Sequence, residues 1–111
     1  MERTCLIVDD EPAIRAYLAA ILRREQYLTL EAENAVQAFK LVQKLNGGLN
    51  LILSEITMPG NLDGVDLAYA VRNEFQGLAD FAFIRKPFTP KAILGAVNRV
   101  ATSSYRVCPS S

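Results

Sequence analysis

The stretch that decides the fold is CLIVDDEP, residues 5–12. Its four apolar residues, Cys5 to Val8, end abruptly in the acidic pair Asp9-Asp10, and a short apolar run bounded in this way indicates a buried strand. Pro12 then favours the first turn of a helix, because a proline there removes no helical hydrogen bond. The stretch therefore predicts a strand that leads directly into a helix.

The same alternation continues along the rest of the chain. Apolar residues with helical spacing separate the further expected strands, which lie at residues 27–32, 49–53 and 81–84. Asn46-Gly47-Gly48 is expected to end the second helix, and Thr89-Pro90 to begin the last one. The order βαβαβαβα predicts an α/β fold, a doubly wound parallel sheet with helices on both faces.

Length and composition fit one domain. The chain has 111 residues, of which 50% are apolar, and that is enough for a single packed core. We expect the domain to comprise residues 1–102. Residues 103–111 offer little that could pack and are expected to form a loose C-terminal tail.

Charge and cysteine content exclude several classes of function. Lys plus Arg equals Asp plus Glu at 12 each, so no basic excess favours nucleic acid or an anionic membrane as partner. The chain has no histidine, which excludes Ser-His and Cys-His catalysis and His-ligated zinc within it. Cys5 is expected to be a buried thiol and Cys108 to lie in the tail, a usage typical of the reducing cytoplasm. The first residues lack the apolar core of a signal peptide, and no apolar run approaches the ~20 residues of a membrane span.

Charged residues follow three of the expected strands. They are Asp9-Asp10, Glu55 and Lys86, and each alone has an ordinary explanation as a helix cap, a solvated strand end or a surface lysine. In a parallel sheet, however, the carboxyl ends of the strands meet at one edge, where ligands bind. Two like charges ~4 Å apart repel by roughly 4 kcal/mol at an effective dielectric constant near 20. Either Lys86 or a hard divalent cation such as Mg²⁺ could relieve that repulsion.

The chain resembles the receiver domains of bacterial two-component response regulators. The segments that carry the resemblance are LIVDDEPAIRAYLAAIL (residues 6–22), LILSEITMPGNLDGVDLA (residues 51–68) and FIRKPFTPKAILGAV (residues 83–97). The resemblance extends over about residues 3 to 101 and implies a flavodoxin-like receiver fold. It also implies a cytoplasmic signalling protein, in which a histidine kinase phosphorylates an aspartate in the presence of Mg²⁺.

The resemblance assigns roles by position. Asp9 and Asp10 match the acidic pair that binds the metal, and Glu55 stands at the phosphoacceptor position beside that metal. The backbone carbonyl of Thr57 matches the third protein ligand. Lys86 matches the lysine that pairs with the phosphate, and the resemblance implies that Pro87 follows a cis peptide bond.

The sequence departs from the family pattern at Glu55, where an aspartate is expected. The extra methylene moves the carboxylate by roughly 1 Å, and a misplacement of that size can lower a rate by about 10²-fold. We therefore expect impaired phosphoryl acceptance. The longer side chain imitates only part of the charge and of the acceptor oxygens of a phosphate.

A second departure is a missing segment. Only residues 76–80 separate the third helix from the strand at 81–84, where the family has a strand, a Ser/Thr loop and a helix. We expect the sheet to be reduced to about four strands, with the 81–84 strand paired directly to 49–53, because unpaired buried backbone groups would each cost about 1–3 kcal/mol.

These observations favour a receiver-type signalling module of a phosphorelay that acts through protein–protein contacts and is not an enzyme. Two alternatives remain open. One is an active receiver that catalyses its own Mg²⁺-dependent phosphorylation on a carboxylate, and the other is a structural dimerisation module. The expected partner is a histidine kinase or a phosphotransfer protein. Self-association, with a second copy of the chain as partner, is a further expectation.

Overall fold

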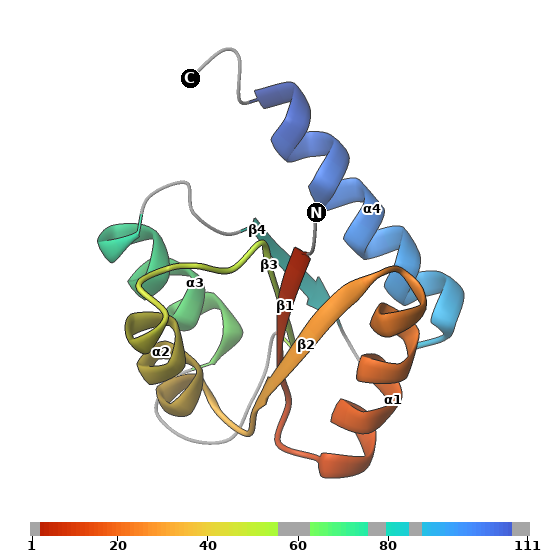
Figure 1. Cartoon of the computed structure of the whole chain (residues 1–111), viewed down its shortest axis with the longest axis horizontal. Coiled ribbons are helices and arrows are strands. Elements are labelled where there is room, and N and C mark those ends of the chain that lie inside the picture. The colour runs from red at the N-terminus through yellow and green to blue at the C-terminus, as the bar shows by residue number, and fades with distance from the viewer. Residues whose placement is uncertain (1–2, 56–62, 76–79, 85–87, 108–111) are drawn as a thin grey trace.

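The computed structural model describes residues 3–55, 63–75, 80–84 and 88–107 of the chain. Strands and helices alternate throughout (Figure 1). In order they are β1 (Arg3–Val8), α1 (Pro12–Arg24), β2 (Tyr27–Ala32), α2 (Ala35–Lys44), β3 (Leu51–Glu55), α3 (Gly64–Glu74), β4 (Asp80–Ile84) and α4 (Pro90–Val107).

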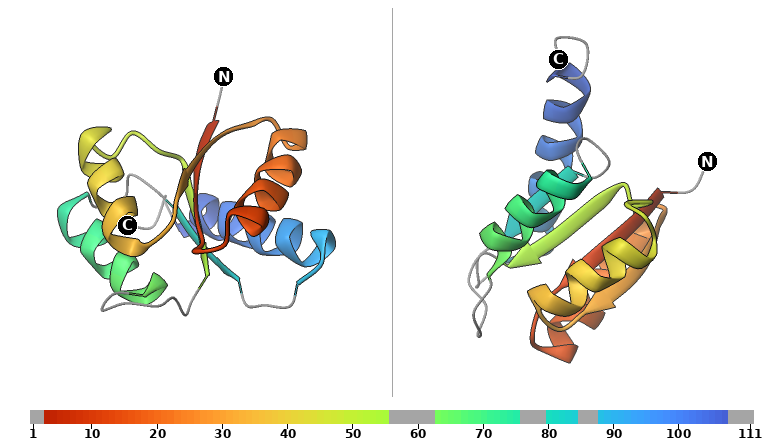
Figure 2. Two further views of the ribbon diagram at one scale, coloured as in Figure 1. Left: turned by 90° about the horizontal axis from the view of Figure 1, so that it is seen from below. Right: turned by 90° about the vertical axis from the view of Figure 1, so that its left-hand side faces the viewer.

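The four strands form one parallel sheet in the order β2-β1-β3-β4. Helices α2 and α3 cover one face of this sheet, and α1 and α4 cover the other (Figure 2). Leu6 and Val8 of β1 pack under α2 and α3, whereas Cys5 and Ile7 pack under α1 and α4. The predicted doubly wound α/β fold is therefore confirmed.

The local signals read from the sequence have physical counterparts at the helix ends. Pro12 occupies the first turn of α1, and the Thr89 hydroxyl accepts a hydrogen bond from the Ala92 amide (3.2 Å) at the start of α4. After α2, Asn46 and Gly47 adopt positive φ angles of 52° and 72°, a conformation that favours glycine and asparagine and ends helices.

Strand β4 pairs directly with β3, as the sequence analysis predicts. Ile52 lies opposite Phe81 and Glu55 opposite Ile84, and the Asp80 amide donates to the Asn50 carbonyl (3.2 Å). β4 is the end strand of the described sheet, and Phe81, Ala82 and Ile84 are only 6%, 1% and 5% exposed. Phe81 packs into the core on one face of the sheet, and Ala82 and Ile84 pack into the core on the other.

Two boundaries differ from the prediction. β3 begins at Leu51 and not at residue 49, and it runs on to Glu55. Helix α4 continues to Val107, whereas the sequence analysis places a loose tail from residue 103. The reason is that neither glycine nor proline occurs between residues 101 and 107, and the next helix-breaking residue is Pro109. Residues 108–111 lie outside the described part of the chain.

The predicted burial of Cys5 is confirmed. Its side chain is fully buried, and desolvation raises the pKa of the thiol to about 12. The thiol is thus protonated and unreactive at neutral pH. Within the described part of the chain, no helix combines the length and hydropathy needed to span a bilayer.

The two leucines Leu53 and Leu28 provide a test of which strand positions support the fold. Leu53 of β3 is 0% exposed, whereas Leu28 of β2 is 50% exposed. Leu53→Ala should lower the free energy of unfolding by about 2–5 kcal/mol, because it leaves a cavity in the core. Leu28→Ala should change it by no more than about 0.5 kcal/mol. Urea denaturation measures both, and equal losses would contradict this description of the core.

Candidate functional site

Three carboxylates gather at the carboxyl edge of the sheet. One oxygen each from Asp9, Asp10 and Glu55 lies within 4.8 Å of the other two. The pairing of β1 with β3 produces this cluster, because Val8 lies opposite Ser54 and the acidic residues come directly after them. The sequence analysis predicts this grouping, and the structure shows it.

The backbone around Asp9 is fixed by hydrogen bonds. Asp9 is fully buried, and its amide donates to the Ala32 carbonyl of β2 (3.2 Å). Its Oδ1 accepts a hydrogen bond from the Glu11 amide (2.9 Å). Asp10 is exposed and Glu55 half-buried, so the cluster is open to solvent on one side.

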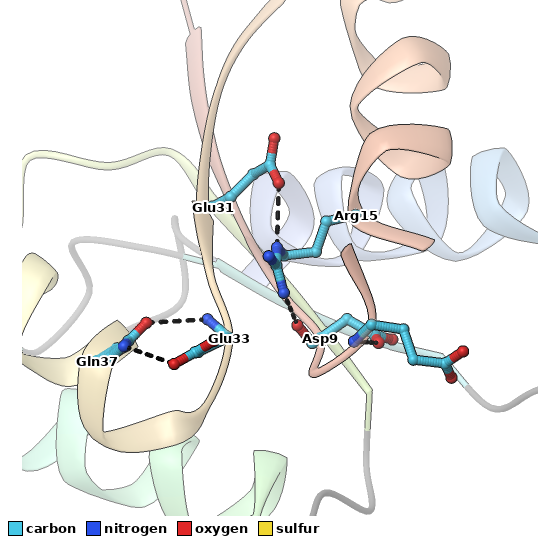
Figure 3. A network of polar contacts seen from close by, with 6 residues as sticks. Asp9, Arg15, Glu31, Glu33 and Gln37 are labelled. Carbon is cyan, nitrogen blue, oxygen red and sulfur yellow. Dashed lines mark hydrogen bonds and ion pairs between the residues drawn. The ribbon is translucent and has the colours of Figure 1, made fainter. Parts of the chain in front are cut away.

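Arg15 of α1 connects this loop to β2 (Figure 3). Its Nη1 donates to the Asp9 carbonyl (2.6 Å) and its Nε to the Glu31 carboxylate (3.1 Å). Beyond the end of β2, and separately from Arg15, Gln37 exchanges two hydrogen bonds with Glu33, at 3.0 and 3.2 Å (Figure 3). This role of Arg15 was not predicted from the sequence, since a basic residue one turn into a helix gives no signal of which carbonyl it reaches.

Glu55 is held through its backbone carbonyl. The hydroxyl of Ser54, which is fully buried, donates to that oxygen (2.9 Å). Gly64, the first residue of α3, lies against the same oxygen. A Cβ at position 64 would collide with it and would lie 3.0 Å from the Ser54 hydroxyl. Glycine is therefore needed at position 64, because α3 begins in close contact with the end of β3.

A capping box fixes the start of α3. The Asp63 carboxylate accepts hydrogen bonds from the Val65 and Asp66 amides (both 3.0 Å), and Asp66 accepts one from the Asp63 amide (3.1 Å). This capping box was not predicted from the sequence, although the aspartate three residues after Asp63 was the available signal.

Three of the expected site residues lie outside the described residues. They are Thr57, Lys86 and Pro87. The third metal ligand, the phosphate-pairing lysine and the cis peptide bond therefore remain predictions.

The chemistry of the cluster suits a hard divalent cation. All three side chains offer carboxylate oxygens, which Mg²⁺ prefers and usually combines with water and phosphate oxygens. The group contains no histidine or cysteine ligand, so the softer donors typical of zinc are missing from it. The residues present thus fit a magnesium ion.

The fold and this site together define a class of protein: a doubly wound α/β domain with a cluster of acidic residues where its first and third strands end. Residues 5–80 match the family model of the response regulator receiver domain. The match comprises more than half of the 111 residues. The chain therefore belongs to the receiver domain family of two-component systems.

Curated relatives and solved structures agree with this assignment. The chain is 34% identical to the response regulator GtcR of Aneurinibacillus migulanus, in an alignment that covers 96% of this chain and 49% of that protein. It is 31% identical to the transcriptional regulatory protein ResD of Bacillus subtilis, in an alignment that covers 94% of this chain and 52% of that protein. The chain thus spans about half the length of these relatives. The crystal structure of the receiver domain of the hybrid histidine kinase CckA superposes with a TM-score of 0.75 at 28% identity, covering 86% of this chain and 96% of that one.

Substitution of Gly64 tests the contact between α3 and β3. Gly64→Ala should lower the free energy of unfolding by about 1–3 kcal/mol, because the methyl group collides with the Glu55 carbonyl. Gly95→Ala is the matched control, since the nearest atom to its added Cβ is Arg99 Nη1 at 3.6 Å. That control should stabilise the protein by about 0.5–1 kcal/mol, as alanine does within a helix. Thermal or urea unfolding measures the stability of both variants. A stabilising effect of Gly64→Ala would refute the contact.

Proposed function

We propose that the chain is a receiver-type signalling module of a phosphorelay, that it acts through protein–protein contacts, and that it accepts phosphoryl groups poorly. The observation that carries the proposal is the position of Glu55. It ends β3 within 4.8 Å of the Asp9 and Asp10 carboxylates, where the receiver family has an aspartate.

Asp9, Asp10 and Glu55, together with the carbonyl of Thr57, would hold Mg²⁺. A bound magnesium ion would neutralise the carboxylates and stabilise negative charge on a phosphoryl group. The residues themselves contribute a prearranged set of oxygens. Asp9 is buried with its amide and Oδ1 in hydrogen bonds, and the Glu55 backbone is fixed by Ser54.

Two features support poor phosphoryl acceptance. The Glu55 side chain is one methylene longer than aspartate, which moves the attacking oxygen by roughly 1 Å from the position that in-line transfer needs. The chain also lacks residues that its relatives have: the GtcR alignment extends over 125 positions, whereas this chain has 111 residues. We infer that the missing segment includes the Ser/Thr loop that senses the phosphoryl group.

A histidine kinase or a phosphotransfer protein is the proposed partner, and the cytoplasm is the proposed location. Self-association is proposed as well, on the basis of apolar side chains exposed on α3. Val65 and Tyr69 of α3 are 40% and 66% exposed, and both are large apolar side chains. A purely structural dimerisation module would show a constant dimer by light scattering across protein concentrations, without any response to Mg²⁺ or a phosphodonor.

Magnesium titration tests the cation site. The unsubstituted protein should bind Mg²⁺ with a roughly millimolar dissociation constant, and Asp10→Asn should abolish the response, since it removes one charged oxygen ligand. Amide chemical shifts in NMR spectra follow the binding. Glu25→Gln, at an exposed acidic position at the far end of α1, is the matched control and should bind normally. An unchanged titration of Asp10→Asn would refute the site.

Phosphorylation by acetyl phosphate tests acceptance itself. Labelling of the unsubstituted protein, followed by intact mass, should be slow and substoichiometric. Glu55→Asp should increase it only in part, because the Ser/Thr loop would still be lacking. Because Glu55→Gln removes the carboxylate at position 55, any labelling of this variant measures phosphorylation at other residues. Fast, stoichiometric labelling of Glu55 would favour the active, self-phosphorylating receiver instead.

A further inference from the structure

Arg15 connects three elements that border the acidic cluster, namely α1, the end of β1 and β2. It projects from α1, donates to the Asp9 carbonyl at the end of β1 (2.6 Å) and pairs with Glu31 of β2 (3.1 Å). Its side chain is 15% exposed, compared with 40% for Glu31. Figure 3 shows the guanidinium between the two acceptors. The ion pair with Glu31 thus orients Nε, and this leaves Nη1 directed at the carbonyl.

The carbonyl that Arg15 contacts belongs to the peptide bond between Asp9 and Asp10. The amide of Asp9 is already fixed by Ala32, and its Oδ1 by the Glu11 amide. A hydrogen bond to the carbonyl fixes the plane of the next peptide group as well, because a peptide unit is planar. That plane fixes the positions of the amide nitrogen and Cα of Asp10, and so constrains the direction in which the exposed Asp10 side chain leaves the backbone. Packing does little to fix that direction, because Asp10 is exposed.

We propose that Arg15 is a positioning residue for the cation site. It holds Asp10 in reach of Asp9 and Glu55 and does not itself touch the cation. The proposal rests on the proposed function, because it concerns the same cluster. Groups that orient metal ligands from outside the ligand shell typically change metal affinity by about 10- to 100-fold when they are substituted.

The charge of Arg15 gives the proposal a sharp test. A guanidinium close to the cluster repels a cation, so its removal should tighten Mg²⁺ binding if charge were its only effect. Loss of positioning should instead weaken Mg²⁺ binding. We therefore expect Arg15→Met to raise the dissociation constant for Mg²⁺ by at least about 10-fold, despite removing a positive charge. Arg15→Lys keeps the charge but cannot bond both acceptors in the same fork geometry, and it should also weaken binding.

Arg23→Met is the matched control. Arg23 also lies on α1 and also contacts β2, through Nε and the Thr29 hydroxyl (3.2 Å), but it lies near the opposite end of the helix from the cluster. It should leave Mg²⁺ affinity unchanged. The free energy of unfolding in EDTA, measured for each variant, separates a general loss of stability from a loss confined to cation binding. Arg15→Lys serves as the test variant if Arg15→Met does not fold.

NMR titration of the full chain with Mg²⁺ alone gives the result. Weaker binding in both Arg15 variants, with normal binding in Arg23→Met, supports the proposal. Equal or tighter binding in Arg15→Met would overturn it and would leave the proposed function intact. A lack of saturable binding by the unsubstituted protein would overturn the cation site itself and the positioning role with it.

Discussion

The pairing of β1 with β3 brings three carboxylates to one edge of the sheet, against their mutual repulsion. Carboxylates ~4 Å apart repel by roughly 4 kcal/mol at an effective dielectric constant near 20. The strands that carry them hold fully buried side chains, among them Ile7 and Leu53, which lie opposite each other in register. Each such side chain contributes about 1.5–3 kcal/mol. A few residues of buried core therefore offset the repulsion and keep the acidic cluster assembled.

The cluster is held chiefly through the backbone. The peptide groups at Asp9 are fixed by Ala32 and Arg15, and the carbonyl of Glu55 is enclosed by Ser54 and Gly64. Backbone contacts of this kind set where each side chain begins. This arrangement is typical of binding sites, in which the supporting contacts are made before a ligand arrives.

The sequence predicts the fold well because three of the four strands are short apolar runs that are followed by charged residues. The direct pairing of β3 with β4 is predictable too, since an empty slot would leave backbone groups unpaired. The end of α4 is less predictable, because serine and threonine neither favour nor break a helix strongly. The roles of Arg15 and Gly64 depend on how α1 and α3 approach neighbouring strands. Local residue patterns do not encode those distances, and Gly64 in particular looks like an ordinary turn glycine.

The direct contact of β4 with β3 has a consequence for how such domains change in evolution. In a parallel sheet each β–α unit starts and ends on the same side, so the ends of a removed unit lie close together and the chain can be rejoined there. The neighbouring strands then close up by one strand spacing, ~4.8 Å. In evolution, a sheet of this kind can therefore differ by one inner unit without a change in the direction or handedness of its other connections.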